Sequence, residues 1–424
     1  MSMDVIIIGA GTGGLITALK LAENGTDVTL FEKSPEETFG NTWCNYVEVS
    51  GFQKYGFPIP KEDEVAFDPY APVDYRTTDD LNSMTIEHFD HYLLKMSHYQ
   101  KRLVTICRDK GVDIQFGQAV EDFIYEADYI SGVVLKGSGK KISAKLVVVA
   151  SGSGALPVKN PADEIVSEFT VPESETVTAI QELWEIDKEM AEGDVAKGLL
   201  PDRDIVMYTG VSGPFSTLMY QLDIKKGLFG VLAGSRIQDE SIISPRKIID
   251  NLIAGFSFCT GRIYGGGRTL PIRNAGDSMV ANGLVVIGDA ACMASPVNGS
   301  GTLTSMIAGK LCAETAVQIL KKGQHFSKEN LWEINYKYQV ETGSVLAGFY
   351  VSQKMIRTLT EKDVQNTIKY NLLRPEDVVR VHSMQPVKIG FFDGISRAIN
   401  AIPVIGLLVG FLGTGIRIQR IMSH

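Results

Sequence analysis

The start of the chain carries the strongest constraint on its fold. A run of apolar residues, VIII at 5–8, precedes the glycine motif GAGTGG at 9–14, and apolar residues at helical spacing follow it. The run predicts a buried parallel strand, and the glycines predict a tight turn into a helix. The stretch DVTLFE then predicts a second strand that ends in Glu32. This order of strand, turn, helix, strand and acid predicts a Rossmann-type domain that binds a dinucleotide.

Each part of this motif has a chemical role in the predicted site. The glycines let the backbone approach a diphosphate, and the helix N-terminus favours its negative charge. Glu32 would accept hydrogen bonds from ribose hydroxyls and disfavours a 2′-phosphate, so we expect NAD or FAD rather than NADP. In this part of the chain we predict cofactor contacts at Gly9, Gly11, Gly13, Gly14, Glu32, Lys33 and Val120.

A second glycine-rich loop favours FAD over NAD. The stretch GDAACMASPVNGSG at 288–301 follows a predicted buried strand, GLVVI, and precedes a predicted helix that begins TLTSMIAGKL. NAD needs only the N-terminal motif, whereas the longer FAD takes a second contact from a distant strand, acid, loop and helix. Asp289 would meet the ribityl or diphosphate portion, unless it only caps a structural helix. The contacts predicted here are Gly288, Asp289, Pro296, Gly299, Gly301 and Thr302.

Composition narrows the class of protein. A chain of 424 residues with a net charge of −9 suits two or three structural units and argues against binding to nucleic acid. Its five cysteines are scattered, which indicates a reducing compartment, and no signal peptide is recognised, so we expect a cytoplasmic location. No metal site is predicted: His88, His91 and His98 are expected on one partly exposed helix, without nearby ligands.

Near the C-terminus, residues 398–416 carry no charge and are flanked by arginines. Pro403 and four glycines make this stretch a poor spanning helix. Three alternatives remain open: a membrane span, peripheral contact with a membrane, and a hairpin packed on the protein. Peripheral contact gives the expected location, which is cytoplasmic and at the membrane surface.

The N-terminal motif and the stretch LPIRNAG…GLVVIGDAA together resemble the geranylgeranyl reductase family, within the FAD enzymes that share the p-hydroxybenzoate hydroxylase fold. The expected fold class is α/β, with a discontinuous Rossmann-type FAD-binding domain, an inserted β-sheet substrate domain and a helical C-terminal region. The FAD-binding domain is expected at 1–50, 85–155 and 266–325, the substrate domain at 51–84 and 156–265, and the helical region at 326–424. Residues 45–84, which lack periodicity, are expected to form an ordered excursion or a lid.

The resemblance implies two catalytic residues. Cys44 matches a family cysteine that lies near the flavin, where a thiol could stabilise the reduced ring or supply a proton. Tyr220 matches the start of the family's lipid-tunnel signature, but Leu222, Ile224 and Lys225 replace its Trp, Phe and Pro. The alternatives are that Cys44 is a small buried residue and that Tyr220 is an ordinary strand aromatic.

The resemblance also implies a reaction, the saturation of carbon–carbon double bonds in an isoprenoid chain or prenyl lipid. In hydroxylases of this fold, an Asp-Gly pair followed by Arg is associated with NADPH. Here Ser151 replaces that Asp and no arginine follows, so the electron donor, a ferredoxin or NAD(P)H, stays open. The alternatives are a monooxygenase or halogenase on the same fold, and a non-catalytic lipid-binding flavoprotein.

Overall fold

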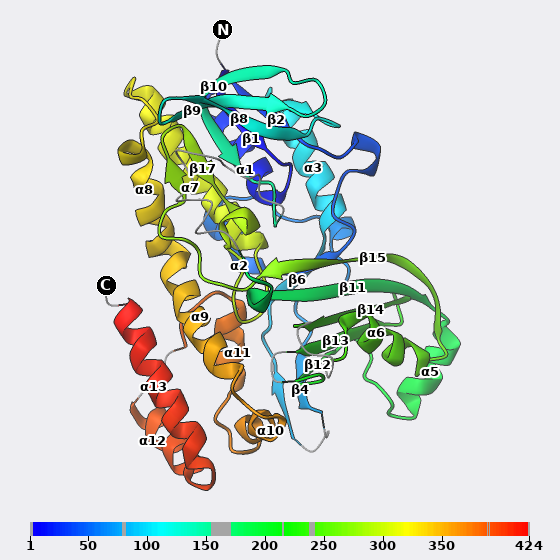
Figure 1. Ribbon diagram of the computed structural model, residues 1–424. Helices are drawn as coiled ribbons and strands as arrows, with labels where there is room; N and C mark the ends of the chain where they lie inside the picture. The colour runs from blue at the N-terminus through cyan, green and yellow to red at the C-terminus, as the bar shows by residue number, and fades with distance from the viewer. Residues whose placement is uncertain are drawn as a thin grey trace.

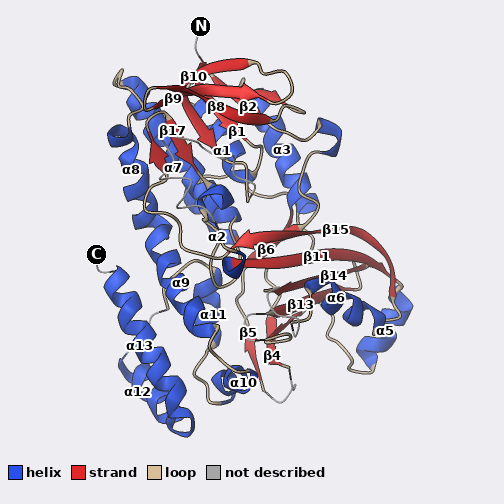
Figure 2. Ribbon diagram, viewed as in Figure 1, coloured by secondary structure: helices blue, strands red, loops and turns tan. Residues whose placement is uncertain are grey.

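Two large sheets and a column of helices make up the molecule (Figure 1). The computed structural model describes residues 3–78, 82–153, 171–213, 216–236, 242–387, 389 and 391–422. The first part of the predicted inserted domain, up to residue 170, therefore lies outside the described residues. Figure 2 shows one sheet near the N-terminus, the other beside α5 and α6, and the C-terminal helices along one side.

The N-terminal sheet is of the Rossmann type. Its strands follow the order β16 (Val280–Ala281), β17 (Leu284–Val286), β10 (Lys141–Val149), β1 (Met3–Ile8), β2 (Val28–Phe31) and β7 (Asp113–Gln115). From β17 to β7 the neighbours are parallel, and Ile7 of β1 lies opposite Val148 and Leu30. Two further strands, β8 (Val120–Glu126) and β9 (Tyr129–Leu135), continue antiparallel from the first residues of β10.

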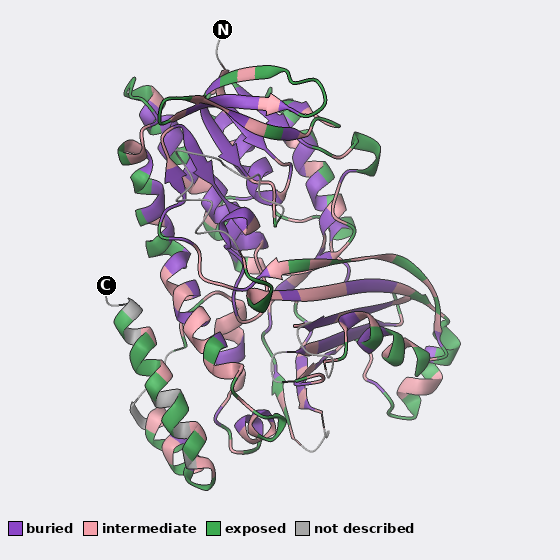
Figure 3. Cartoon of the chain, viewed as in Figure 1, coloured by how far each residue is buried: buried purple, intermediate pink, exposed green. Residues whose placement is uncertain are grey.

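Helices cover this sheet because its strands are apolar on both faces. Those that pack in this part are α1 (Thr12–Ala22), α3 (Met96–Asp109), α7 (Thr302–Lys321) and α8 (Lys328–Tyr338). Helices α1 and α7 approach each other closely: a methyl group on Gly309 would lie 2.5 Å from the carbonyl oxygen of Gly13. This contact brings the two glycine-rich stretches of the sequence together. The largest hydrophobic core lies between these helices and the sheet (Figure 3).

The second sheet is mostly antiparallel. Its strands follow the order β15 (Cys259–Pro271), β11 (Thr176–Ile186), β14 (Leu228–Ser235), β13 (Thr217–Asp223), β12 (Ile205–Thr209), β4 (Val73–Thr77) and β5 (Ser83–Ile86). Helices α5 (Lys188–Ala196) and α6 (Pro245–Ala254) pack on one face. Residues 84 and 265 were the expected ends of the two parts of the substrate domain. Strand β5 crosses residue 84 and β15 continues past residue 265, because pairing with β4 and β11 extends both strands.

The segment 45–84 has regular structure at both ends. Strand β3 (Cys44–Glu48) pairs with β6 (His91–Lys95), and α2 (Val49–Tyr55) follows β3. The expectation that His88, His91 and His98 share one helix is wrong. His91 begins β6, His98 lies in α3 and His88 lies outside both, because pairing with β3 overrides the helical spacing.

The C-terminal region is helical, as expected. A π-helical turn at Gln339–Gly343 joins α8 to α9 (Ser344–Ile356). The helices that follow are α10 (Glu361–Lys369), α11 (Pro375–His382), α12 (Phe391–Asn400) and α13 (Ile405–Met422). Helix α13 packs against α9, as a hairpin with α12 (Figure 1). Within the described ranges, no helix has both the length and the apolar character needed to cross a membrane. Short 3-10 turns lie at Glu36–Thr38, Glu62–Glu64, Glu173–Glu175, Gly288–Ala291 and Ile402–Val404.

Candidate functional site

An open cavity, with about 880 Å³ of empty space including the solvent at its mouth, lies where the two sheets and the starts of α1 and α7 meet. The N-terminal motif, the loop before α7, strand β3 and strands β11, β14 and β15 all contribute to its wall. Eight of the predicted site residues line it: Gly11, Gly13, Cys44, Gly288, Asp289, Gly299, Gly301 and Thr302. The fold therefore brings the two glycine elements into one site.

The glycines of the first motif have different physical roles. A methyl group on Gly14 would lie 2.1 Å from the carbonyl oxygen of Gly9, and one on Gly9 would lie 2.5 Å from that of Ala150. These two glycines therefore allow close packing within the protein. Gly11, by contrast, faces open space, because a methyl group there would meet only Ala150, at 3.9 Å. Gly11 leaves room for a ligand at the start of α1.

The second loop supplies another helix start to the same cavity. Helix α7 begins after Gly301, so Asp289 does not cap it, and the N-cap of the short turn that contains Asp289 is Ile287. A side-chain hydrogen bond of 2.8 Å, from the Asn45 amide to the Thr302 hydroxyl, ties this loop to β3. The alternative of Asp289 as a simple helix cap is therefore wrong, and its carboxylate lines the cavity.

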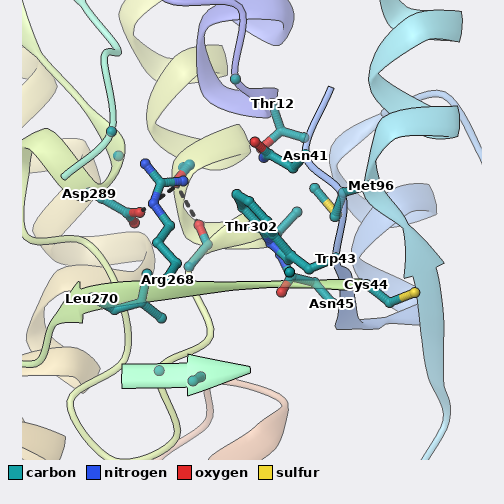
Figure 4. Close-up of a pocket in the computed structure, with 18 of the residues that line it drawn as sticks. Thr12, Asn41, Trp43, Cys44, Asn45, Met96, Arg268, Leu270, Asp289 and Thr302 are labelled. Atoms are coloured by element: carbon teal, nitrogen blue, oxygen red, sulfur yellow. Dashed lines mark hydrogen bonds and ion pairs between the residues drawn. The ribbon is translucent and has the colours of Figure 1, made fainter. Parts of the chain in front are cut away.

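The carboxylate of Asp289 faces a guanidinium that the sequence had not indicated. Arg268 of β15 places Nη1 3.9 Å from Oδ2 of Asp289, and its guanidinium lies 5.5 Å from the ring centroid of Trp43 (Figure 4). Burial raises the pKa of Asp289, and the positive charge of Arg268 opposes that rise. In the sequence, the run of glycines before Arg268 was the only indication of a close approach at this place. In the structure, a methyl group on Gly266 would lie 2.9 Å from the Thr42 hydroxyl.

Glu32 ends β2 as predicted and is tied to the backbone. Its carboxylate accepts hydrogen bonds from the amides of Ala10 and Ser34, each at 2.9 Å. A carboxylate has about four acceptor positions, so it can still accept bonds from ribose hydroxyls. Glu32 does not line the cavity among the described residues, and neither do Gly9, Gly14, Lys33, Val120 and Pro296. Lys33 is exposed, whereas Val120 is buried at the start of β8.

Cys44 lines the cavity at the start of β3, but its thiol lies in an apolar cluster with Ala66, Phe67, Leu93 and Leu183. In Figure 4 the sulfur points away from Asp289 and Arg268. Burial raises the pKa of Cys44 to about 12, against a smaller opposing effect of Lys95. The thiol is therefore protonated at neutral pH. Its backbone amide donates a hydrogen bond to the side-chain oxygen of Gln181.

Tyr220 lies on the other face of the second sheet. Its ring packs 5.8 Å from that of Phe229 and 6.2 Å from that of Phe256, under α6. The neighbouring residues Met219 and Gln221 face the opposite side, toward Tyr46 and Leu93. Successive side chains of a strand alternate between faces, so the sheet separates Tyr220 from the cavity.

The cavity offers two helix starts, which suits a cofactor such as FAD that is longer than NAD. Both helices start at a glycine, Gly11 and Gly301, and no side-chain cap is present at either described start, so their first amides can bind an anion. Two buried polar atoms next to cavity-lining residues, Oγ of Ser151 after β10 and Nδ2 of Asn298 in the loop before α7, have no hydrogen-bond partner within the described residues. No group of His, Cys, Asp and Glu suited to a metal ion occurs in the described part of the chain.

Comparison with known proteins gives the class first. The family of FAD dependent oxidoreductases matches residues 4–59, which contain the first glycine motif. Together with the fold and the two-part site, this match identifies the chain as an FAD-dependent oxidoreductase, and FAD as its cofactor. The predicted α/β fold class is confirmed.

Within this class, the predicted resemblance to geranylgeranyl reductases is confirmed. The chain is 24% identical to a digeranylgeranylglycerophospholipid reductase of Sulfolobus acidocaldarius, over 95% of this chain and 88% of the relative. It is also 24% identical to digeranylgeranylglycerophospholipid reductase 2 of Methanococcoides burtonii, over 87% of each chain.

Solved structures share the fold. A geranylgeranyl bacteriochlorophyll reductase-like protein from Thermoplasma acidophilum has a TM-score of 0.74 at 14% identity, and the match covers 95% of this chain and 97% of that one. A flavin-dependent brominase has a TM-score of 0.64 at 14% identity, with 96% and 99% covered. Because a halogenase shares the architecture, the fold by itself does not distinguish between these reactions.

Proposed function

We propose that this protein is an FAD-dependent reductase that saturates carbon–carbon double bonds in the isoprenoid chains of a prenyl lipid. The observation that carries the proposal is the composition of the cavity wall. The cofactor loops form one side of the wall, and Ala179, Leu232 and Leu270, on one face of the second sheet, form an apolar side against which an isoprenoid chain can pack. Relatives with the reductase name extend over most of the chain, which supports the same reaction.

In the proposed mechanism, FAD, when bound and reduced by the electron donor, would supply a hydride to one alkene carbon, and a proton would be added to the other. The amides at the start of α1 would hold the diphosphate, and Asp289 with Arg268 would orient the middle of the cofactor. The apolar strands exclude water from the alkene. Cys44 keeps its proton at Sγ at neutral pH, and a thiol this weakly acidic would release it only to a strongly basic carbon.

A direct assay tests the reaction. The purified FAD-loaded protein, reduced with dithionite, is mixed with digeranylgeranylglyceryl phosphate, and the lipid is analysed by mass spectrometry. We expect a mass gain of one H₂ for each double bond reduced. No gain on any prenyl lipid would overturn the proposal. Formation of a flavin hydroperoxide, with transfer of oxygen or halide to a substrate, would favour the monooxygenase or halogenase alternative instead.

The electron donor follows from a parallel measurement. Ser151 stands where related hydroxylases have the Asp associated with NADPH, so a reduced ferredoxin is the donor that the proposal favours. Anaerobic stopped-flow mixing of the oxidised protein with reduced ferredoxin or with NAD(P)H would record bleaching of the flavin. Faster bleaching by NAD(P)H would assign that donor instead.

We also propose that the α12–α13 hairpin contacts the membrane that holds the lipid, with the protein in the cytoplasm. Large apolar side chains lie exposed along the hairpin: Ile395, Ile399, Ile402, Val409 and Ile416. Ile402, at the tip, is 66% exposed, and the exposed Arg417 suits anionic lipid headgroups.

Sedimentation with anionic vesicles tests this contact. Ile402→Asp should reduce the bound fraction, because it places a carboxylate at the membrane interface. Ile59→Asp is the matched control, since Ile59 is 58% exposed on a different part of the molecule. Equal binding of both variants and the unaltered protein would contradict the proposed contact.

A further inference from the structure

Positively charged side chains gather at one end of the second sheet. Arg236 directly follows β14, and Arg273 lies two residues beyond β15. The strand register places Thr176 of β11 opposite Pro271 and Thr178 opposite Ser235, so both arginines lie at the end of the sheet where β11 begins. In Figure 1 this end of β11 and β15 reaches toward α9, whose last turn supplies Lys354 and leads into Arg357. We call Arg236, Arg273, Lys354 and Arg357 the basic cluster.

One carboxylate, that of Glu175, lies among these cations. It accepts a hydrogen bond of 2.5 Å from the Tyr350 hydroxyl and lies 3.8 Å from Nε of Arg273. The ring of Tyr350 also carries Lys354, whose Nζ lies 4.3 Å from the ring centroid. Arg236 donates a hydrogen bond of 3.2 Å to the carbonyl oxygen of Ser174, next to Glu175. Within the described residues, the Glu175 carboxylate thus interacts with Arg273 and Arg357, while Arg236 and Lys354 contact its neighbours Ser174 and Tyr350.

Arg357 has two side-chain nitrogens whose hydrogen bonding is incomplete. Its Nε and Nη2 are buried and have no hydrogen-bond partner in the part of the chain that the structure describes. Burial lowers the pKa of Arg357, and the positive charge of Arg236 acts in the same direction. Two buried guanidinium nitrogens without hydrogen bonds are costly, and an anionic oxygen pair would satisfy both at once.

The cluster adjoins the candidate active site. Leu270 lines the cavity and lies three residues before Arg273, and Leu232 lines it four residues before Arg236. At about 3.3 Å per residue, the cluster is about 10 Å from the apolar wall along the strands. Leu270 and Val177 also contact the position of Gly299, within 3.5 and 4.0 Å of a methyl group placed there. An amphipathic molecule with one anionic end would match the basic cluster and the apolar wall next to it.

We propose that the basic cluster, through Arg357 and Arg236, binds the phosphate of a prenyl phospholipid whose isoprenoid chain extends along the apolar wall toward the flavin. This inference rests on the proposed function and adds the part of the substrate that the protein recognises. The chemistry it requires is a phosphate monoester or diester. Free phosphate presents the same oxygens, so the test must separate the lipid from the free ion.

The test measures binding and does not depend on reduction. FAD-loaded protein is titrated in detergent with two saturated lipids, diphytanylglyceryl phosphate and diphytanylglycerol, and the change in flavin fluorescence gives each Kd. Arg357→Gln should weaken binding of the phosphate lipid about 10- to 100-fold, the value of a charge-assisted hydrogen-bond pair, and should leave the neutral lipid unchanged. The matched control is Arg203→Gln, because Arg203 is exposed and distant in sequence from the cluster.

The outcomes separate the possibilities. If Arg357→Gln weakened the binding of both lipids equally, or left the Kd of the phosphate lipid unchanged, the inference would be overturned. If millimolar inorganic phosphate binds the protein but does not compete with the phosphate lipid, the cluster is a site for the free ion and the inference is also wrong. Selective binding of the phosphate lipid together with no reduction of any prenyl lipid would uphold this site and reject the proposed function.

Discussion

The guanidinium of Arg268 lies 3.9 Å from the carboxylate of Asp289, although Arg268 belongs to β15 of the second sheet and Asp289 to the short 3-10 turn before α7. Arg268 extends from β15 and occupies the space beside Gly152, where a methyl group would lie 2.2 Å from its Nη2. The pair connects the substrate-side sheet to the loop that holds the second part of the cofactor site. Arg268 thus lines the cavity between the second sheet and the loop before α7.

Replacement of Arg268 should weaken FAD binding. Arg268→Gln removes the positive charge that opposes the raised pKa of Asp289 and loses the contact with Trp43. We expect a loss of about tenfold in FAD affinity, measured as Kd by titration of the apoprotein with FAD and flavin fluorescence. Arg203→Gln should leave the Kd unchanged. An unaltered Kd in Arg268→Gln would show that this arginine does not contact the cofactor.

Two glycines of the same motif should respond differently to alanine. Gly14→Ala places a methyl group 2.1 Å from a backbone oxygen, so we expect a loss of at least about 2 kcal/mol in the free energy of unfolding of the apoprotein. Gly11→Ala faces the cavity, so the apoprotein should unfold at the same denaturant concentration while FAD binding falls. Urea unfolding and FAD titration of both variants check this contrast. Similar effects in the two variants would contradict the separate roles.

The thiol of Cys44 should react slowly with alkylating reagents. Its pKa of about 12 leaves about a thousandfold less thiolate near pH 8 than a thiol with the ordinary pKa of 9. Peptide mass spectrometry after iodoacetamide treatment gives the rate at Cys44, with the urea-denatured chain as the control. If the labelling rate of the folded protein reached a plateau near pH 8, Cys44 would be a thiolate at that pH and the prediction would be wrong. If Cys44→Ser leaves turnover unchanged, Cys44 has no part in the reaction.

The pair of buried His91 and half-buried His382 should make the fold sensitive to acid. Burial, with a smaller effect from His91, lowers the pKa of His382 to about 3, so the folded state keeps this side chain neutral. The unfolded chain takes up the proton near pH 6.5, so stability is complete above that pH and falls as the pH decreases toward 3. Between pH 6.5 and 5 the loss should be about 2 kcal/mol in the free energy of unfolding.

Variants of two histidines isolate this effect. His382→Phe keeps an aromatic ring next to Phe89, whose ring centroid lies 5.0 Å away, and removes the titrating group. Urea unfolding at both pH values should then show a smaller loss than in the unaltered protein. His325→Asn serves as the control because His325 is exposed. The same loss in His382→Phe as in the unaltered protein would assign the acid sensitivity to other groups.

Local sequence determined the two cofactor elements of this protein. The turn from β1 into α1, the end of β2 at Glu32 and the loop before α7 each show in the spacing of residues within one short stretch, where glycines occupy positions that other residues cannot. Such features can be recognised from spacing alone, because the neighbours that enforce them lie close along the chain.

Only the tertiary structure decided which other residues reach the site. Arg268 enters the cavity because β15 pairs with β11, and Tyr220 is excluded because strand side chains alternate, so a shift of one residue moves a side chain to the other face. His91 joins a strand rather than a helix because β3, more than forty residues away, pairs with it. These positions are set by pairing between distant segments, which local spacing does not encode.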